Sequence, residues 1–189
     1  MKYNKDIHHR RSIRLKQYDY SKEGIYYITI CTQNRECILG KIENNVTNVN
    51  NMQNVGAPAH RCPENTTKIR LSKKGQIVEK YLNNINIVYK NIRLEEYVIM
   101  PNHLHFVINV MSSGHLWAGG HLWAGAPTKD KPITIAKIIN SLKTITSKEI
   151  GYPIWQRNYY EHVVRNEKEL YRIIKYIKNN PINWKNDDN

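Results

Sequence analysis

The stretch YVIMPNHLHFVINV, residues 97–110, holds two runs of β-branched, aliphatic and aromatic side chains on either side of Pro101 and Asn102. Proline and asparagine favour turns, and the flanking runs have the composition of strands. We therefore predict an antiparallel hairpin with strands over residues 95–100 and 103–110.

The second strand of this hairpin divides its side chains between two faces. Because side chains alternate along a strand, Leu104, Phe106 and Ile108 share a face that we expect to enter the core. His103 and His105 then share the opposite face, with Cβ atoms about 7 Å apart. Two imidazoles at this spacing can bind one metal ion, such as magnesium or manganese with a third oxygen ligand. The alternative is two histidines on an ordinary polar face of the sheet.

Further elements are predicted on both sides of the hairpin, and their order decides the fold class. Two more strands are expected within residues 25–32 and 154–164. Helices are predicted at three capping residues, namely Ser72 for residues 73–89, Thr134 for the helix ending at Gly151, and Asn166 for the helix ending before Pro181. The order β-α-β-β-α-β-α is typical of an α+β fold, a ferredoxin-like sandwich with an antiparallel sheet and an added C-terminal helix.

The chain is expected to form one domain over residues 23–184. A basic N-terminal arm, residues 1–22, precedes it, and a polar tail, residues 185–189, follows. Within the domain, residues 43–67 and 111–131 lack apolar periodicity and are predicted to be loop insertions.

Two segments inside these insertions differ in composition from the rest of the chain. Residues 114–125 repeat Gly-His-Leu-Trp-Ala-Gly in tandem, and residues 56–63 read GAPAHRCP. Codons can be chosen so that the DNA for residues 56–63 is the reverse complement of the DNA for residues 120–127. We therefore hypothesise that both are translated copies of one hairpin-forming repeat, inserted into loops that tolerate added length. A tryptophan-bearing binding loop is the alternative for the tandem repeat.

The charge balance indicates a polyanionic partner. Lysine and arginine number 29 against 16 aspartate and glutamate residues, which gives a net charge of +13. A small domain this basic usually binds nucleic acid, although a solubilising surface charge is the alternative. Arg10, Arg11 and Arg14 concentrate positive charge in the N-terminal arm, which is expected either to bind DNA phosphates or to be a flexible tail.

The sequence also indicates where the protein works. No apolar run approaches the roughly 20 residues of a bilayer span, and the N-terminus lacks the apolar segment of a secretory signal. The three cysteines lack zinc-site spacing and fit a reducing compartment. We therefore expect a cytoplasmic protein without a membrane partner.

Two polar residues of the last helix can complete a site with the histidines. Tyr176 and Asn180 are four residues apart, so they lie on one helix face. Tyrosine is among the side chains that form covalent intermediates, and an amide oxygen can bind a divalent ion. An ordinary tyrosine in an amphipathic helix is the alternative, because the chain has 13 tyrosines.

Three segments resemble a known family. YVIMPNHLHF (97–106) is similar to the signature of the HUH single-tyrosine transposases, and WQRNYYEHVVRN (155–166) with YIKNNP (176–181) resembles the REP-associated branch of that family. The resemblance implies a protein that cuts single-stranded or hairpin DNA and becomes joined to it through a 5′-phosphotyrosine. It implies that Tyr176 is the nucleophile, and that His103, His105 and Asn180 bind magnesium or manganese, with Asn179 as the alternative third ligand. Relatives act as homodimers or as monomers.

Further residues of these segments are expected to contact DNA. Trp155, Tyr159 and His162 are candidates for stacking on bases, and Arg157 and Arg165 for holding phosphates. Gln156 lies in the same segment and completes the predicted interface. The alternative for Trp155 and Tyr159 is a place partly in the core.

The sequence thus favours a metal-dependent DNA endonuclease and strand transferase of DNA transposition. The alternative is a hairpin-repeat DNA-binding protein derived from a transposase, with little or no cleavage activity. A third possibility is a metallo-phosphoesterase that uses the histidines but not Tyr176. The presence of His103, His105, Tyr176 and Asn180 together favours the first.

Overall fold

A four-stranded antiparallel sheet forms the centre of the computed structural model, which describes residues 22–45, 66–111 and 134–184. The strands lie in the order β4-β5-β1-β6. Their bounds are Gly24–Cys31 for β1, Ile92–Ile99 for β4, His103–Val110 for β5 and Tyr160–Val164 for β6. The predicted hairpin is therefore confirmed as β4 and β5, which pair antiparallel around Pro101 and Asn102.

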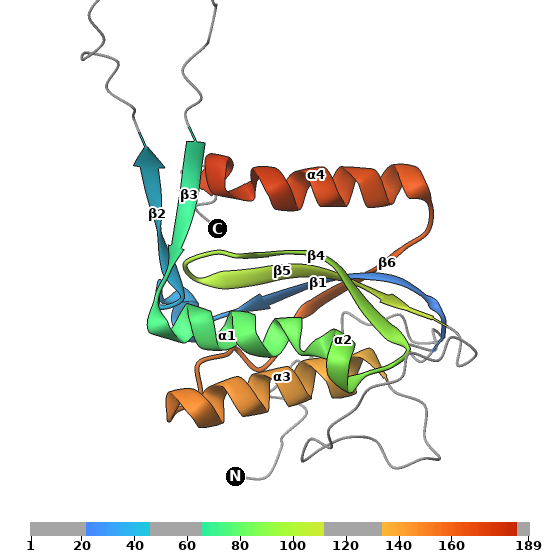
Figure 1. Ribbon diagram of the computed structural model, residues 1–189, viewed down its shortest axis with the longest axis horizontal. Helices are drawn as coiled ribbons and strands as arrows, with labels where there is room; N and C mark the ends of the chain where they lie inside the picture. The colour runs from blue at the N-terminus through green and yellow to red at the C-terminus, as the bar shows by residue number, and fades with distance from the viewer. Residues whose placement is uncertain (1–21, 46–65, 112–133, 185–189) are drawn as a thin grey trace, which may run out of the picture.

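Helices cover both faces of this sheet. Figure 1 shows α4 on one face and α1, α2 and α3 on the other. The bounds are Lys73–Asn83 for α1, Ile85–Val88 for α2, Ile135–Ile150 for α3 and Glu167–Asn183 for α4, with a short 3₁₀ turn over Gln33–Arg35. This arrangement confirms the predicted α+β sandwich with an added C-terminal helix. No helix of the described ranges is long and apolar enough to cross a membrane.

The core lies between the sheet and the layer of α1 and α3. Strand β1 pairs with β5 so that Ile28 faces Phe106 and Ile30 faces Leu104, and all four side chains are fully buried. The odd-numbered residues of β1 then point to the α4 side of the sheet, as do the two histidines of β5. The alternation predicted from the sequence is therefore what separates the core from the polar face.

A β-bulge in β4 keeps its apolar side chains on the core face. Leu94 pairs with Ile108, whereas Glu96 pairs with Val107, so one extra residue, Glu95, is inserted. The core-facing apolar residues have even numbers up to Leu94 and odd numbers from Tyr97, and the extra residue of the bulge keeps both sets on one face. As a consequence Glu96 faces α4, where its carboxylate forms an ion pair of 3.1 Å with Lys178.

The three predicted capping residues all begin helices. The side chains of Ser72, Thr134 and Asn166 accept backbone N–H groups of the first turns of α1, α3 and α4. Two predicted ends were wrong. The helix expected over 73–89 breaks at Asn84, a residue type of low helix propensity. Helix α4 continues through Pro181, which lies so near its end that only one backbone hydrogen bond is forfeited.

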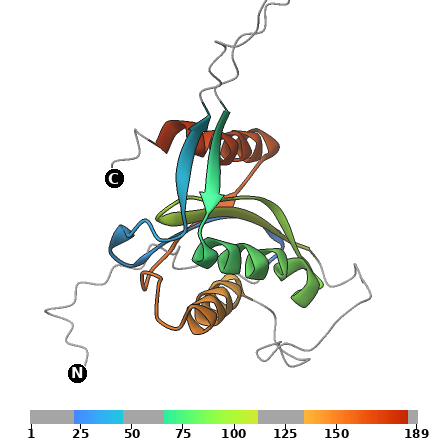
Figure 2. The same cartoon turned by 60° about the vertical axis from the view of Figure 1, so that its left-hand side comes forward.

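The predicted loop over 43–67 was wrong at both ends. Strands β2 (Gly40–Asn45) and β3 (Thr66–Leu71) form a two-stranded antiparallel ribbon that projects from the body beside α4 (Figure 2). One face of the ribbon carries the half-buried Ile42, Ile69 and Leu71, whereas the charged side chains on the other face are exposed. This alternation is too short to have marked the two strands in the sequence. The composition segments 56–63 and 114–127 lie outside the described residues, as do the N-terminal arm and the polar tail.

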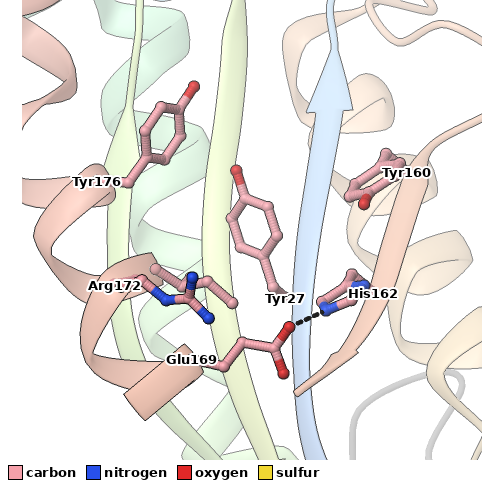
Figure 3. A pocket seen from close by; sticks show the side chains of 7 residues that line it. Tyr27, Tyr160, His162, Glu169, Arg172 and Tyr176 are labelled. Carbon is pink, nitrogen blue, oxygen red and sulfur yellow. Dashed lines mark hydrogen bonds and ion pairs between the residues drawn. The ribbon is translucent and has the colours of Figure 1, made fainter. Parts of the chain in front are cut away.

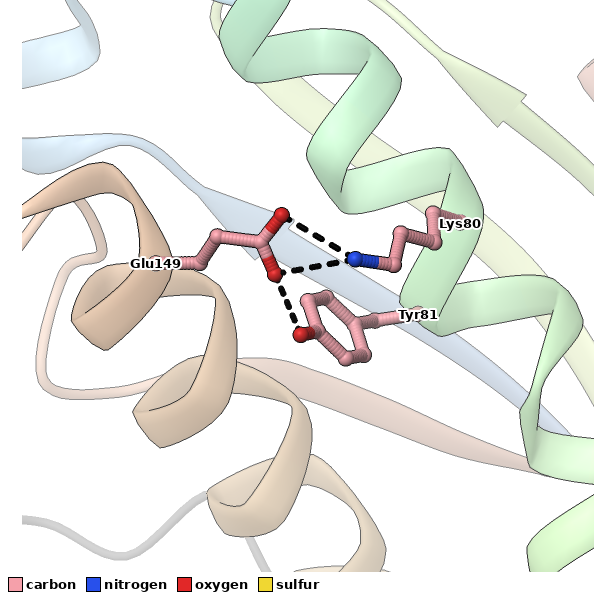
Figure 4. Close-up of polar contacts among 3 residues, drawn as sticks. All are labelled: Lys80, Tyr81 and Glu149. Atoms are coloured by element: carbon pink, nitrogen blue, oxygen red, sulfur yellow. Dashed lines mark hydrogen bonds and ion pairs between the residues drawn. The ribbon is translucent and has the colours of Figure 1, made fainter.

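Two surface contacts join the helices below the sheet. Glu149 of α3 accepts hydrogen bonds from Lys80, at 3.1 and 3.2 Å, and from the Tyr81 hydroxyl, both on α1 (Figure 4). These bonds lower the pKa of Glu149, with the Tyr81 hydroxyl as the largest cause. They fasten α1 to α3 on the side of the sheet away from α4.

We expect Gly75→Ala to destabilise the protein. A Cβ at Gly75 would lie 2.0 Å from the backbone carbonyl oxygen of Leu39, so α1 would have to move. Overpacking of this kind costs about 1–3 kcal/mol, whereas the same change in an exposed helix stabilises by about 1 kcal/mol. Urea unfolding measures the difference, with Gln76→Ala on the exposed side of α1 as the control. An unchanged midpoint for Gly75→Ala would contradict the close packing.

Candidate functional site

Two histidines of β5 lie side by side on the face of the sheet that α4 covers. The ring centroids of His103 and His105 are 4.5 Å apart, and both residues are buried. The Nδ1 atom of His105 is hydrogen-bonded to the Tyr27 and Thr29 hydroxyls of β1, each at 2.8 Å. These contacts leave Nε2 as the ring nitrogen of His105 that is available to a ligand.

The turn before β5 orients the first histidine in a similar way. The Nδ1 atom of His103 is hydrogen-bonded to Asn102 Oδ1 at 2.6 Å. The backbone of this turn is itself fixed, because the Thr32 N–H and hydroxyl both donate to the Asn102 carbonyl, at 2.9 and 2.8 Å. Metal-binding histidines commonly use their second ring nitrogen in such contacts, which fix the ring orientation.

Helix α4 brings Tyr176 and Asn180 to the same place. The Tyr176 ring lies 5.4 Å from the His105 ring in an edge-to-face arrangement, and Tyr176 remains 45% exposed. Asn180, one turn later, is 1% exposed. Trp184 closes this end, with its ring 6.0 Å from that of His103. Tyr176 and Trp184 thus both lie near the histidines, and Asn180 lies between them on the same face of α4.

The electrostatics of the site favour the neutral form of the His105 imidazole. Burial, and next the neighbouring His103, lower the pKa of His105 to about 3. A neutral imidazole keeps a lone pair for a metal ion, whereas an imidazolium does not. His105 can thus act as a ligand at neutral pH. The net charge of +13 on the chain also disfavours a further positive charge on this ring.

The donors at the site fit a divalent ion. In the described part of the chain, no group of three or more His, Cys, Asp or Glu side chains is placed to hold a metal ion. An amide oxygen is available instead, since Asn180 Oδ1 is buried without a hydrogen-bond partner among the described residues. Two imidazoles and an amide oxygen can hold a divalent ion, and the amide oxygen is the donor of this set that favours Mg²⁺ or Mn²⁺. The half-buried Asn179 fits this role less well.

A groove of about 420 Å³ opens beside Tyr176, between α4 and strands β1 and β6 (Figure 3). His162 Nε2 and Glu169 Oε1 are 2.8 Å apart across it. The other carboxylate oxygen of Glu169 accepts the Arg165 N–H at 2.8 Å, and this bond is the largest cause that lowers the Glu169 pKa. The groove is lined by Tyr27, Tyr160, His162, Glu169, Arg172, Ile173 and Tyr176.

Trp155 and Tyr159, two of the residues predicted to stack on bases, pack against the core, as the alternative for them expected. Trp155 is 7% exposed in the core, and its indole N–H donates to the Thr146 hydroxyl at 2.8 Å. Tyr159 packs against the core, with Lys143 of α3 over its ring. The reason for Tyr159 is the alternation along β6, which points Tyr160 rather than Tyr159 toward α4.

The remaining predicted DNA contacts are spread around the site. Arg157 and Arg165 are exposed, and Gln156 is half-buried. Lys143 fixes the loop before β6 by donating to the carbonyls of Gln156, Arg157 and Asn158, at 2.9–3.2 Å. Arg10, Arg11 and Arg14 lie outside the described residues.

Several residues of the site were not predicted from the sequence. Tyr27 of β1 lies opposite Val107 of β5 and His162 of β6. Thr29 lies opposite His105 of β5 and Tyr160 of β6. Their polarity, between the buried Tyr26, Ile28 and Ile30, was the available signal. Arg172 and Glu169 carried no such signal, because charged residues in a helix are usually solvated.

Comparison with known proteins gives a relative and a fold. No protein-family model matches this chain. An uncharacterized protein of Haemophilus influenzae is 39% identical over 195 residues, which cover 98% of this chain and 96% of that protein. The fold is similar to that of the REP-associated tyrosine transposase bound to a REP hairpin, with a TM-score of 0.55 and 15% identity over 91% of this chain and 74% of that chain. The likeness to the transposase structure shows that the two chains share a fold.

We expect Trp155→Phe to lower stability without weakening DNA binding. The change removes the indole N–H that donates to Thr146 and leaves a smaller ring in a tightly packed site. The free energy of unfolding should fall by about 1–3 kcal/mol. Urea unfolding and a gel-shift titration with a hairpin oligonucleotide measure the two effects. A stable variant with weakened DNA binding would return Trp155 to the interface.

Proposed function

Because this chain belongs to one family with the uncharacterized Haemophilus influenzae protein and has the fold of a tyrosine transposase, we propose that it is a nuclease and strand transferase. It acts on single-stranded or hairpin DNA, requires a divalent metal ion, and forms a 5′-phosphotyrosine intermediate.

One observation carries this proposal. A tyrosine, two buried histidines and a buried amide oxygen from distant parts of the chain converge on one face of the sheet. Tyr176 is the exposed member of the group, and the potential ligands behind it are buried. An arrangement with a reachable nucleophile over a protected ligand set is what a covalent phosphoryl-transfer mechanism needs.

Tyr176 performs the covalent steps. Its phenolic oxygen attacks a phosphorus atom of the DNA backbone, a P–O bond to tyrosine forms, and the P–O3′ bond breaks to release a 3′-hydroxyl. A second 3′-hydroxyl reverses the reaction and rejoins the strand, so the bond energy is conserved without a nucleotide cofactor. Helix α4 is held for this task by the Lys178–Glu96 ion pair and by the His162–Glu169 contact.

His103, His105 and Asn180 would hold the metal ion. A bound divalent ion neutralises charge that develops on the phosphate oxygens. Asn102, Tyr27 and Thr29 fix the histidine rings through Nδ1 and so present the other ring nitrogens to that ion. The Trp184 ring lies beside His103, at 6.0 Å between ring centroids.

Exposed cations around the groove would hold the DNA backbone. Arg165 precedes α4, Arg172 lies at the groove, and Arg157 lies in the loop before β6. Contacts of arginine with phosphates supply affinity that falls steeply with salt and carries little sequence information. The cleavage chemistry and the DNA affinity therefore reside in different side chains and can be separated by mutation.

We expect Tyr176→Phe to abolish the covalent adduct while DNA binding is kept. The substitution removes only the attacking oxygen. Labelled hairpin oligonucleotides are incubated with the protein and Mn²⁺, and adducts are resolved on a denaturing gel. Tyr171→Phe is the matched control, because Tyr171 is 68% exposed on the same helix. An adduct that persists in Tyr176→Phe would contradict the assignment, and DNA binding without any adduct in the native protein would favour a binding protein.

We expect Asn180→Ala to weaken metal binding and Asn179→Ala to leave it unchanged. Isothermal titration with Mn²⁺ alone measures this without reference to activity. The affinity should fall by at least about tenfold for Asn180→Ala, since even outer contacts of metal sites have effects of this size. Circular dichroism confirms that each variant is folded. Equal Mn²⁺ affinity in both variants and in the native protein would exclude Asn180 as a ligand.

A further inference from the structure

We propose that the groove beside Tyr176 binds the nucleobase adjoining the scissile phosphate, unstacked from its neighbours and laid against Tyr160. This inference rests on the proposed function and adds a specificity site to it. The groove has a volume of about 420 Å³, within the range of roughly 300–1,000 Å³ typical of small-ligand sites. Because Tyr176 forms one of its walls, an occupant lies beside the residue that carries the attacking oxygen (Figure 3).

The aromatic walls suit a planar base. Tyr160 is 50% exposed, and its ring meets that of Tyr27 edge-to-face, with centroids 6.2 Å apart. Tyr27 is fixed from behind, since its hydroxyl is hydrogen-bonded to His105 and its ring stacks on the His105 imidazole at 5.5 Å. The two rings form a corner with one rigid side and one side open to solvent. Base–aromatic stacking of this kind is the usual way in which proteins hold an unpaired base.

The polar groups are placed to recognise a nucleotide rather than an apolar ligand. His162 is held by Glu169, which in turn is held by the Arg165 N–H, so a fixed imidazole borders the groove. Arg172 precedes Tyr176 by four residues and therefore lies on the same face of α4. Figure 3 shows both side chains at the groove. The imidazole can meet a base edge, and the guanidinium can meet a backbone phosphate.

The position of Tyr27 links base binding to the histidine site. A base laid in this corner contacts the ring whose hydroxyl orients His105. If the wrong base or no base were bound, water could enter this corner beside the potential metal ligands. The groove therefore contributes to the choice of cleavage position, which phosphate contacts alone do not supply.

The test uses DNA binding, so it does not depend on cleavage. The full-length Tyr176→Phe protein binds hairpin oligonucleotides in which the fluorescent base 2-aminopurine is moved one position at a time through the single-stranded flank. Stacking quenches this fluorophore. At one position, we expect the bound fluorophore to be at least about threefold dimmer than in the complex with the additional Tyr160→Ala change, whereas Tyr160→Phe should keep it dim. Tyr152→Ala is the matched control, because Tyr152 is 45% exposed and contacts Lys74 on the opposite side of the sheet.

A second measurement locates that position relative to the chemistry. The native protein is tested with an abasic site on each side of the phosphate that it cuts. One abasic site should slow adduct formation roughly tenfold to a hundredfold, the size expected from loss of one stacked base, and Tyr160→Ala should then cause no further loss. Quenching that is the same with Tyr160→Ala, or that lies away from the cut phosphate, overturns the inference. Failure of the proposed function differs, because DNA then fails to bind or no adduct forms at all.

Discussion

The pairing of β1 with β5 is the constraint on which the rest of the structure depends. Their register places Ile28 against Phe106 on the core face and Thr29 against His105 on the other. A shift of one residue would exchange the two faces, moving histidines into the apolar core and aliphatic side chains under α4. The burial of that core therefore fixes the polar site as well, and the free energy that stabilises the fold also positions the chemistry.

The sequence was sufficient for the elements whose signals are local. The alternation in residues 103–110 predicted the faces of β5, and the caps Ser72, Thr134 and Asn166 predicted where three helices begin. Their order then predicted the layers. The convergence of Tyr176 with the histidines needed the family resemblance as well, because no local pattern states that α4 folds back over β5.

The parts that could not be predicted depend on contacts distant in sequence. The apolar face of the β2–β3 ribbon is short, with Ile42, Ile69 and Leu71, and its strands are separated by residues 46–65. Trp155 has the side chain of a base-stacking residue, but its indole N–H donates to the buried Thr146 hydroxyl. Likewise, the partner of His162 is a glutamate in the next helix, and a helical glutamate is ordinarily solvated. In each case the partner decides the role, and the sequence alone does not name the partner.

The bulge in β4 has a consequence for association between molecules. β4 is an edge of the sheet, and an exposed edge can pair with a strand from another chain and start aggregation. The extra residue Glu95 interrupts the regular ladder there, and Arg93 and Glu96 add charge beside it. At the other edge, β6 is only five residues long. The irregularity that turns Glu96 toward α4 thus also makes this edge a poor template for a foreign strand.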